Sequence, residues 1–359
     1  MSLFFSLKKI FYKITSAPFI KKRQNRSIVI KCESKNWVLN QLANEYKNCF
    51  LNFSNNISLD EKDIFLSKNI DLFIMSKYHA FENLKKYKNR VYFPYFHGIQ
   101  GEKEIDFQSI KFIKNNLNNI ERIQITNSLI ENFFLENSIP KTKFRKIPIT
   151  VDIKKFNNLN NFNSKDLRNK YNIPLDSFVI GSFQKDGNGW GEGVSPKLIK
   201  GPDIFIKTIK ILKDLIPELF VLLSGPSRGY LKRELEKLNV KYKHIFFENY
   251  DDLIKLYKCI DVYLITSREE GGPRAIMESF ASKIPLVTTN VGQAIDLVKS
   301  NFNGFKSEKV NEEFLADLVF SKIYNKVDNL DQILKNGYLT VEKNSYKSQI
   351  SLWKSFFNF

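Results

Sequence analysis

The sequence predicts an α/β protein built from two doubly wound, parallel-sheet domains that face each other across a cleft. Short apolar runs alternate with amphipathic helical patterns in both halves of the chain, which is typical of parallel strands joined by helices. An Asn-rich polar segment, residues 152–163, separates the halves and is expected to be a linker. A chain of 359 residues is long enough for two hydrophobic cores.

Residues 1–26 form a basic N-terminal segment with seven Lys or Arg residues and no acidic residue. Lysines interrupt its apolar positions, so it lacks the continuous apolar core of a secretory signal. The pattern fits a helix packed on the first domain, or a basic amphipathic helix on an anionic membrane surface. The second alternative would place the protein on the inner face of the plasma membrane.

Composition favours the cytoplasm over a secreted or membrane-spanning protein. No run approaches the roughly 18 apolar residues that a membrane span needs. Three scattered cysteines, Cys32, Cys49 and Cys259, offer neither a disulfide framework nor a metal motif. The net charge of +18 indicates an anionic partner, which could be phosphate-bearing, a membrane surface or nucleic acid.

The first domain is expected over residues 27–151. Its predicted strands are the apolar runs Ser27–Ile30, Leu72–Met75, Arg90–Phe93 and Ile123–Thr126. One helix is expected over Lys35–Tyr46, and Asn127–Ser128 would cap a second helix that ends near Asn137.

The second domain is expected over residues 164–340. Its predicted strands are Phe178–Phe183, Leu219–Leu223, Ile245–Phe247, Val262–Ile265 and Leu286–Thr289. Gly201-Pro202 opens a helix between the first two of these strands. Residues 341–359 follow the domain as a helix with a wide apolar face.

The stretch Ser267–Glu278 is the strongest candidate for a functional site. It follows the strand Val262–Ile265, contains two glycines, and places Pro273 at the first position of a helix. A helix N-terminus with flexible backbone is suited to a phosphate group. Glu270 stands at the mouth of the turn, and Glu278, about 1.5 turns into the helix, could accept hydrogen bonds from a sugar diol. An ordinary turn with solvated glutamates fits this stretch equally well.

The loop 184–193 follows another strand of the same sheet and should face the same cleft. Its four glycines, which include Gly187 and Gly189, suit a backbone that closes over a substrate, although a disordered surface loop is the competing interpretation. Lysines at its two ends are candidates to neutralise a diphosphate, or are ordinary solvated residues: Lys185, Lys197 and Lys200.

In the first domain, His97 ends a predicted strand and should point at the cleft, with a structural and a catalytic role equally compatible with its position. Residues 34–37, after the first strand, contain no Gly-rich phosphate turn, which argues against a dinucleotide fingerprint there.

Glu270 and Glu278 form the E-x7-E pattern of retaining glycosyltransferases of the GT-B fold. Residues 269–281 resemble the signature of the glycosyl transferases group 1 domain, family 4. Further segments resemble that family in the same order: Ile147–Asp152, Lys200-Gly201, Asp261–Leu264, Val291-Gly292, Asp296–Val298 and Gly304. The resemblance is strong over about residues 145–305 and weaker over 27–140.

The resemblance implies a nucleotide-sugar donor, UDP- or GDP-linked, held mainly by the second domain. Glu278 would bind the ribose, Glu270 the transferred sugar, and Lys200 the charge on the leaving group. His97 would lie near the donor sugar, and Lys185 would replace an arginine that the family usually has. The diphosphate would lie on the turn formed by Gly271, Gly272, Pro273 and Arg274. The family usually needs no divalent metal, so no metal ion and no cofactor are expected, and the last helix would cross back onto the first domain.

The implied reaction is sugar transfer with retention of anomeric configuration to a saccharide or lipid-linked acceptor, in surface polysaccharide, lipopolysaccharide or glycolipid assembly. A GT-B phosphorylase or a sucrose-synthase-like enzyme is the alternative within the same class. A non-catalytic nucleotide-sugar-binding protein or a nucleic-acid-binding protein is the alternative outside it. Nucleic acid is not the expected partner, because the sequence shows no basic stripe with interleaved aromatics and no known module.

Overall fold

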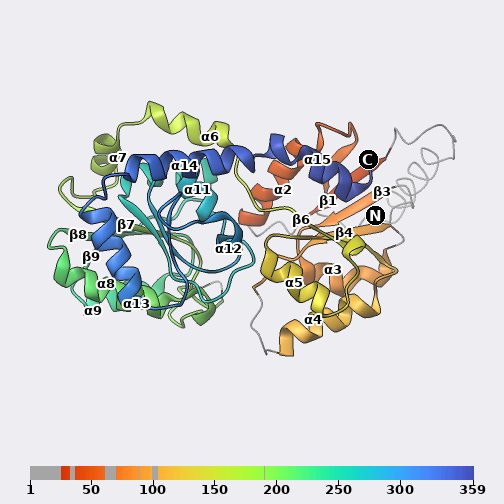
Figure 1. The fold of residues 1–359 in the computed structure, drawn as a ribbon, viewed down its shortest axis with the longest axis horizontal. Helices are drawn as coiled ribbons and strands as arrows, with labels where there is room; N and C mark the ends of the chain where they lie inside the picture. Colours follow the sequence, from red (N-terminus) through yellow and green to blue (C-terminus); the bar gives the residue numbers. More distant parts are fainter. Residues whose placement is uncertain (1–25, 33–36, 61–69, 88, 99–103, 190) are drawn as a thin grey trace, which may run out of the picture.

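The computed structural model describes residues 26–32, 37–60, 70–87, 89–98, 104–189 and 191–359. The basic segment expected over residues 1–26 therefore lies, except for Arg26, outside the described residues. The predicted fold class is confirmed: the described chain forms two six-stranded sheets with only parallel pairings, in two lobes that lie side by side (Figure 1).

The N-terminal sheet has the strand order β2-β1-β3-β4-β5-β6. Its strands are β1 (Ser27–Lys31), β2 (Ile57–Asp60), β3 (Ile70–Ile74), β4 (Arg90–Pro94), β5 (Ile120–Ile125) and β6 (Phe144–Lys146). The α-helices of this domain are α2 (Trp37–Phe50), α3 (Lys77–Asn83), α4 (Glu104–Asn115) and α5 (Ser128–Glu136).

The C-terminal sheet has the order β12-β11-β10-β7-β8-β9. Its strands are β7 (Phe178–Phe183), β8 (Leu219–Ser224), β9 (Lys241–His244), β10 (Val262–Ile265), β11 (Leu286–Thr289) and β12 (Phe305–Ser307). The chain leaves β7 in one direction and returns to β10 on its other side. The topological switch point therefore lies between β7 and β10, and their carboxyl ends form the usual binding edge of such a sheet.

The helices of the C-terminal half begin directly after β6. They are α6 (Ile153–Asn157), α7 (Ser164–Lys170), α8 (Pro202–Leu215), α9 (Gly229–Lys237), α10 (Tyr250–Leu256), α11 (Ala275–Ala281), α12 (Ala294–Leu297), α13 (Glu312–Asp317), a π-helix (Leu318–Tyr324), α14 (Leu330–Lys343) and α15 (Tyr346–Phe357). Short 3-10 helices occupy Leu84–Lys86, Lys141–Lys143, Asn158–Asn161, Leu198–Lys200 and Tyr257–Cys259.

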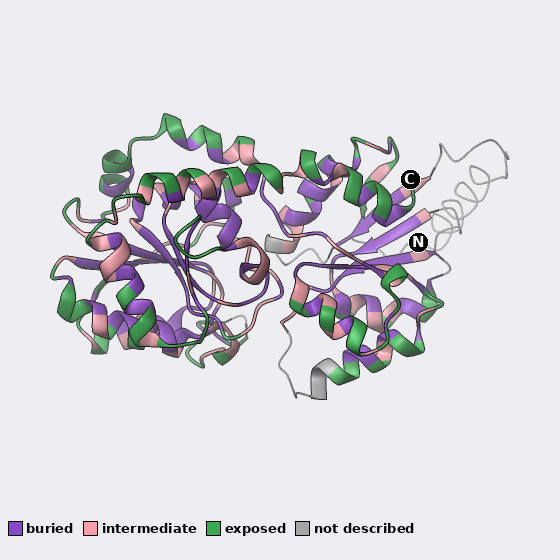
Figure 2. Cartoon of the chain, viewed as in Figure 1, coloured by how far each residue is buried: buried purple, intermediate pink, exposed green. Residues whose placement is uncertain are grey.

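Successive residues of the central strands pack into different cores, so both faces of each sheet are covered. Val179 of β7 belongs to one core cluster and Ile180 to another, and Val29 and Ile30 of β1 divide in the same way. Figure 2 shows the buried strands inside helices whose outer faces are exposed. The strands consequently have near-continuous apolar sequences, as expected of buried parallel sheets.

Helix α15 packs on the N-terminal domain, as the predicted fold class required (Figure 1). The Trp353 ring lies 4.9 Å from the rings of Tyr46 and Phe50, measured between centroids. Phe356 and Phe357 are also buried in this cluster. Aromatic contacts therefore fix the end of the chain to the domain in which it began.

The structure differs from the sequence predictions in three respects. The expected strand Ile245–Phe247 lies four residues earlier, as β9, where Lys241–His244 pair with β8 at the sheet edge. The polar segment 152–163 is not simply a linker, because it forms α6 and a 3-10 helix that bury Phe156 and Leu159. The edge strands β2, β6 and β12 were not predicted.

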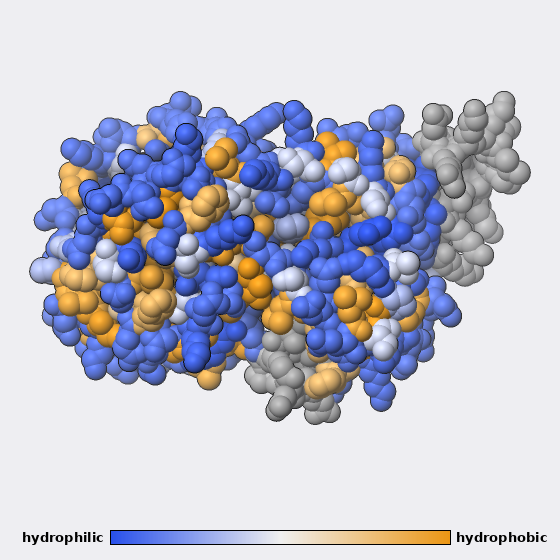
Figure 3. All heavy atoms as spheres, viewed as in Figure 1, coloured by the Kyte–Doolittle hydropathy of each residue, from blue (hydrophilic) through white to orange (hydrophobic). Residues whose placement is uncertain are grey.

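The visible surface is mainly hydrophilic, with apolar side chains in small groups (Figure 3). Within the described residues, none of the helices combines the length and the apolar character needed to cross a membrane.

Candidate active site

Glu270 lies in the turn between β10 and α11 and forms an ion pair with Lys200. Lys200 Nζ donates to Glu270 Oε2 at 2.5 Å, and Ser267 Oγ donates to Oε1 at 2.9 Å. The Glu270 side chain is only 9% exposed and that of Lys200 is 24% exposed. The structure thus brings together two of the predicted catalytic residues, 70 positions apart in the chain.

The backbone around Lys200 is fixed against the end of β10. Gly201 adopts a left-handed conformation, with φ of 62°, and a Cβ atom there would lie 1.9 Å from the Thr266 carbonyl oxygen. Thr266 Oγ1 donates to the Gly201 carbonyl at 2.8 Å. Only glycine permits this close approach of the two backbones, which explains why glycine follows Lys200.

Glu278 lies in α11 with its carboxylate buried, 6% exposed. Tyr250 OH donates to Oε1 at 2.5 Å and Tyr257 OH donates to Oε2 at 2.7 Å. Burial and the nearby Glu278 carboxylate hold the pKa of both tyrosines well above the usual value, so both hydroxyls stay protonated and donate. The orientation of the carboxylate is therefore fixed before any ligand binds.

Gly271 is one of the points at which the two domains touch. A Cβ atom on Gly271 would lie 2.1 Å from the Phe96 carbonyl carbon, and one on Gly98 would lie 2.9 Å from the Glu270 nitrogen. Asn127 Nδ2 donates to the Gly271 carbonyl at 2.7 Å, and Thr126 Oγ1 donates to it as well. Backbone from the first domain therefore rests directly on the turn that carries Glu270.

His97 lies at this contact, beyond β4, with a half-buried ring. Burial, together with the positive charges of Lys77, Lys200 and Lys197, lowers the pKa of His97 to about 3. The imidazole is therefore neutral at physiological pH. Its Nδ1 atom is buried and has no hydrogen-bond partner among the described residues. A neutral imidazole can exchange hydrogen bonds with hydroxyl groups, but it carries no charge toward phosphate.

The loop after β7 is anchored rather than disordered. Ser227 Oγ donates to the Gly191 carbonyl at 2.9 Å, and Gly229 N donates to the Glu192 carbonyl at 2.6 Å. Beneath the loop, buried Arg228 lies 3.2 Å from Asp186, without the alignment of a hydrogen bond. The described part of the loop therefore packs along the N-terminal end of α9.

One cavity of about 390 Å³ opens between the domains, and most of the predicted site residues line it. Its walls include His97, Lys185, Lys200, Glu270, Gly272, Pro273, Arg274 and Glu278. Leu39 and Leu42 of α2 contribute apolar wall from the first domain, and Pro226 and Leu253 contribute it from the second. The volume lies within the range of small-molecule sites.

Three residues predicted at the donor site do not line this cavity. Gly271 is covered by the Phe96 backbone, and Gly187 packs against Gly193 and the Ser227 carbonyl. Gly189 is exposed in the loop, away from the cavity walls. Gly187 and Gly193 thus permit the close packing of the loop on the start of α9, whereas Gly189 and Gly191 have open space around them.

Arg274 lines the cavity, and its side chain contacts carboxylates of both domains. Its Nη2 atom donates to Glu45 Oε1 of α2 at 2.6 Å, and its Nε atom lies 3.2 Å from Glu278 Oε1. The following helix begins at Ala275 rather than at Pro273. Arg274 therefore extends toward the first domain from the turn.

Several residues at the site carried no sequence signal. Tyr250 and Tyr257 hold Glu278 but precede it by 28 and 21 positions. Glu45 comes from the opposite domain, and Ser267 is an ordinary serine in sequence. The hydrogen-bonding tyrosines after β9 could have been found only from a three-dimensional fold.

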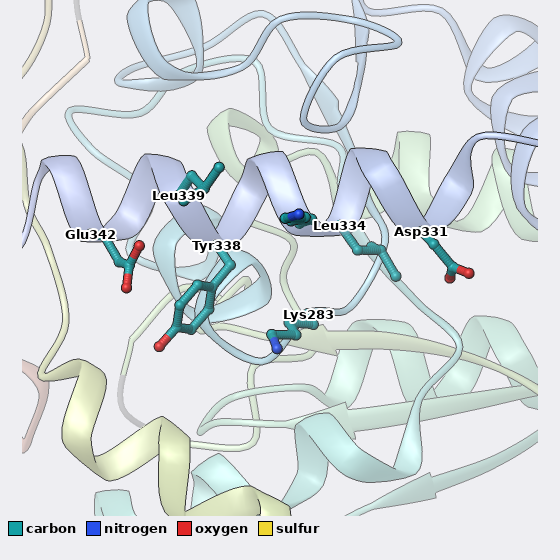
Figure 4. Close-up of a pocket in the computed structure, with 7 residues that line it drawn as sticks. Lys283, Asp331, Leu334, Tyr338, Leu339 and Glu342 are labelled. Atoms are coloured by element: carbon teal, nitrogen blue, oxygen red, sulfur yellow. The ribbon is translucent and has the colours of Figure 1, made fainter.

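A second depression, of about 490 Å³, lies on the outer surface of α14 (Figure 4). Lys283 Nζ lies there 5.0 Å from the centroid of the Tyr338 ring. None of the predicted site residues lines it. Among the described residues, no group of three or more His, Cys, Asp or Glu side chains is placed to hold a metal ion.

Comparison with known proteins supports the resemblance. Residues 196–339 match the family model of glycosyl transferases group 1. UDP-Gal:alpha-D-GlcNAc-diphosphoundecaprenol alpha-1,3-galactosyltransferase of Escherichia coli is 26% identical over 213 residues, which cover 54% of this chain and 51% of that protein. The capsular polysaccharide biosynthesis glycosyltransferase CapM of Staphylococcus aureus is 31% identical over 110 residues, 31% of this chain and 28% of its own. The aligned part thus spans about half or less of these relatives.

A solved structure covers nearly the whole chain. HepE of Anabaena, determined in complex with UDP and glucose, superposes with a TM-score of 0.69 over 93% of this chain and all of its own, at 14% identity. The fold is GT-B. At this level of identity the structural likeness establishes the fold, while the family match and the relatives point to a glycosyltransferase.

Proposed function

We propose that the protein is a retaining, family 4 glycosyltransferase that moves a sugar from a nucleoside-diphosphate sugar to a saccharide or lipid-linked acceptor. The observation that carries the proposal is the arrangement of Glu270, Lys200 and Glu278 on one cavity between two doubly wound domains. This cavity lies at the topological switch point of the C-terminal sheet, where such folds bind nucleotides.

The nucleoside would lie on the C-terminal wall, with its ribose at Glu278. Pro226 and Leu253 supply apolar surface for the base. Glu278 is a buried, ionisable acceptor held by two tyrosine hydroxyls, so it is suited to accept a hydrogen bond from a hydroxyl group. This assignment makes Glu278 a binding residue, separate from the reacting sugar.

Lys200 would stabilise the negative charge that develops on the departing diphosphate. It is fixed by the Gly201 turn and by Glu270, so little reorganisation is needed when the charge appears. Lys185 lines the same cavity and would contribute a second positive charge. Burial lowers the pKa of Lys185 below its usual value.

Glu270 and His97 would face the transferred sugar. Both line the cavity, one from each domain. Neutral His97 can hydrogen-bond a sugar hydroxyl, while Glu270 offers a carboxylate whose orientation Ser267 and Lys200 hold. We infer attack from the face on which the diphosphate leaves, so that positioning and electrostatics, rather than a covalent enzyme intermediate, drive transfer.

Protein cations are proposed to stabilise the leaving group without a divalent metal or a cofactor. The names of the relatives support a role in surface polysaccharide or lipid-linked saccharide assembly, since one concerns a diphosphoundecaprenol-linked sugar and another capsular polysaccharide. Location at the inner face of the plasma membrane remains part of this proposal.

The first experiment is a thermal-shift screen of UDP- and GDP-sugars, followed by a hydrolysis assay of each stabilising compound. A true donor should raise the melting temperature and release a nucleoside diphosphate. Proton NMR of early product should then show the anomeric configuration of the donor. Adding inorganic phosphate separates transfer from phosphorolysis, since a phosphorylase would form a sugar phosphate. No stabilisation by any compound of the screen would refute the proposal.

A further inference from the structure

Arg274 connects the Glu278 carboxylate to the opposite domain. Its side chain is 9% exposed, and its Nη2 atom donates to Glu45 Oε1 at 2.6 Å. Its Nε atom lies 3.2 Å from Glu278 Oε1 and donates to Tyr250 OH at 3.1 Å. The guanidinium also lies over the Tyr250 ring, 4.5 Å from its centroid. One buried cation therefore contacts two carboxylates from different domains.

Glu45 joins two further parts of the chain at the same point. Tyr346, the first residue of α15, donates to Glu45 Oε2 at 2.6 Å, and Gln41 Nε2 donates to Oε1 at 2.7 Å. Glu45 is itself 4% exposed. Side chains from α15 and α2 thus fix the Glu45 carboxylate, which in turn binds Arg274.

The lone pairs of Glu278 show what Arg274 contributes. A carboxylate has about four acceptor positions, and the hydroxyls of Tyr250 and Tyr257 occupy two of them. Arg274 lies against the same carboxylate as an ion pair, with Nε 3.2 Å from Oε1. The carboxylate cannot rotate without breaking these contacts, so its remaining acceptor positions have a fixed direction. Without Arg274, the buried negative charge would keep two neutral donors but lose its neighbouring cation.

We propose that Arg274 is a positioning residue, which orients Glu278 for a donor hydroxyl and makes that orientation depend on the contact between the domains through Glu45. This inference rests on the proposed function, because it takes the ribose as the group at Glu278. Opening of the domains would separate Arg274 from Glu45. By linkage, a nucleotide that binds the oriented Glu278 stabilises the domain arrangement in which this ion pair is made.

The inference predicts that Glu45, although it belongs to the opposite domain, affects recognition of the ribose. We would measure the dissociation constants of UDP and 2′-deoxy-UDP, and of the GDP pair in parallel, by calorimetry on the full chain. Glu45→Gln and Arg274→Lys should each weaken ribonucleotide binding on the order of tenfold and reduce the ratio of deoxy to ribo dissociation constants. Glu278→Gln provides the reference for lost discrimination.

The matched control is Lys146→Met. Lys146 forms another ion pair between the domains, with Asp296 at 3.1 Å, and does not contact Glu278. This variant should leave the ratio of the two dissociation constants unchanged. The control therefore distinguishes a general loss of contact between the domains from a loss of Glu278 positioning. Should Arg274→Lys not fold, the near-isosteric Glu45→Gln decides alone.

Two results would overturn the inference. If Glu278→Gln loses discrimination but folded Glu45→Gln retains both wild-type affinity and wild-type discrimination, positioning through Arg274 is refuted while the proposed function stands. If the wild-type protein binds neither nucleoside diphosphate, the proposed function and the inference both fail.

Discussion

Replacing Lys200 by methionine tests the electrostatic part of the proposed mechanism. The substitution keeps an unbranched side chain and removes one positive charge. It leaves Glu270, which is 9% exposed, with Ser267 as its remaining partner in the turn. Because Lys200 sits where the leaving-group charge should develop, its loss should raise the barrier more in the transition state than in the ground state.

The structure sets the expected magnitudes. Removing one preorganised electrostatic donor from an active site costs about 10²–10³-fold in kcat. The effect on folding should be smaller. Breaking a fully buried ion pair costs about 3–5 kcal/mol and an exposed pair about 0–1 kcal/mol, and Lys200 is 24% exposed. We therefore expect a loss of roughly 1–3 kcal/mol in the free energy of unfolding.

The assay is turnover at saturating donor, together with urea denaturation of the same preparation. Lys200→Arg should retain part of the activity, since it keeps the charge but changes its geometry. Lys207→Met is the control, because it removes an exposed ion pair with Glu312 of 3.1 Å on α8, away from the cavity. Folded Lys200→Met with kcat within a fewfold of wild type would refute the assignment.

Three further predictions address other parts of the structure. The pKa of His97 is about 3 in the folded protein and about 6.5 in the unfolded chain, so the unfolded chain binds a proton more readily. The free energy of unfolding should therefore fall as the pH drops from about 6.5 toward 3, by at most ~1.4 kcal/mol per pH unit. His97→Gln should flatten this slope in urea titrations, and an unchanged slope would contradict it. Gly271→Ala should lower both the melting temperature and turnover, because its Cβ would lie 2.1 Å from the Phe96 carbonyl carbon. Gly191→Ala, which has open space around it, should lower neither. Equal behaviour of the two variants would contradict the contact between the domains at Gly271. Trp353→Ala should cost about 3–5 kcal/mol of folding stability, measured by denaturant unfolding against exposed Leu352→Ala; a loss below 1 kcal/mol would contradict the packing of α15.

The central strands of both sheets could be predicted from sequence because they are buried on both faces. Runs such as Leu219–Leu223 are continuously apolar, and helices separate them. The strands that were not predicted, or were predicted at the wrong residues, are all edge strands of the two sheets: β2, β6, β9 and β12. Edge strands are short and partly polar, so they lack the apolar signal; β9 reads Lys-Tyr-Lys-His.

The candidate site was predictable to the extent that its residues share one short stretch. Glu270 and Glu278 are eight positions apart and follow a recognisable strand. His97 was predicted from its strand-end position, Lys200 from its place beside the glycine-rich loop, and both from the resemblance; the structure places them on the same cavity. Tyr250, Tyr257 and Glu45 were not predictable, because nothing in their local sequence indicates which carboxylate or cation they contact.

The contact partners of Arg274 and of the loop glycines could likewise not be predicted from sequence. Sequence shows that Arg274 adjoins a turn suited to phosphate, but only the folded chain shows that Glu45 from α2 accepts its hydrogen bond. Gly187 and Gly193 indicate close backbone approach, and the structure shows that the approaching group is the Ser227 carbonyl. A conformational requirement can therefore be predicted before the partner that imposes it.

The most direct test of the account is the comparison of wild type with Glu270→Gln in donor binding and turnover. Nucleoside diphosphate affinity, measured by calorimetry, should stay within a fewfold of wild type, because Glu278 rather than Glu270 is assigned to the nucleoside. Sugar transfer or donor hydrolysis should fall by at least ~10²-fold. Unchanged turnover in the folded variant would contradict the claim that this carboxylate acts on the transferred sugar.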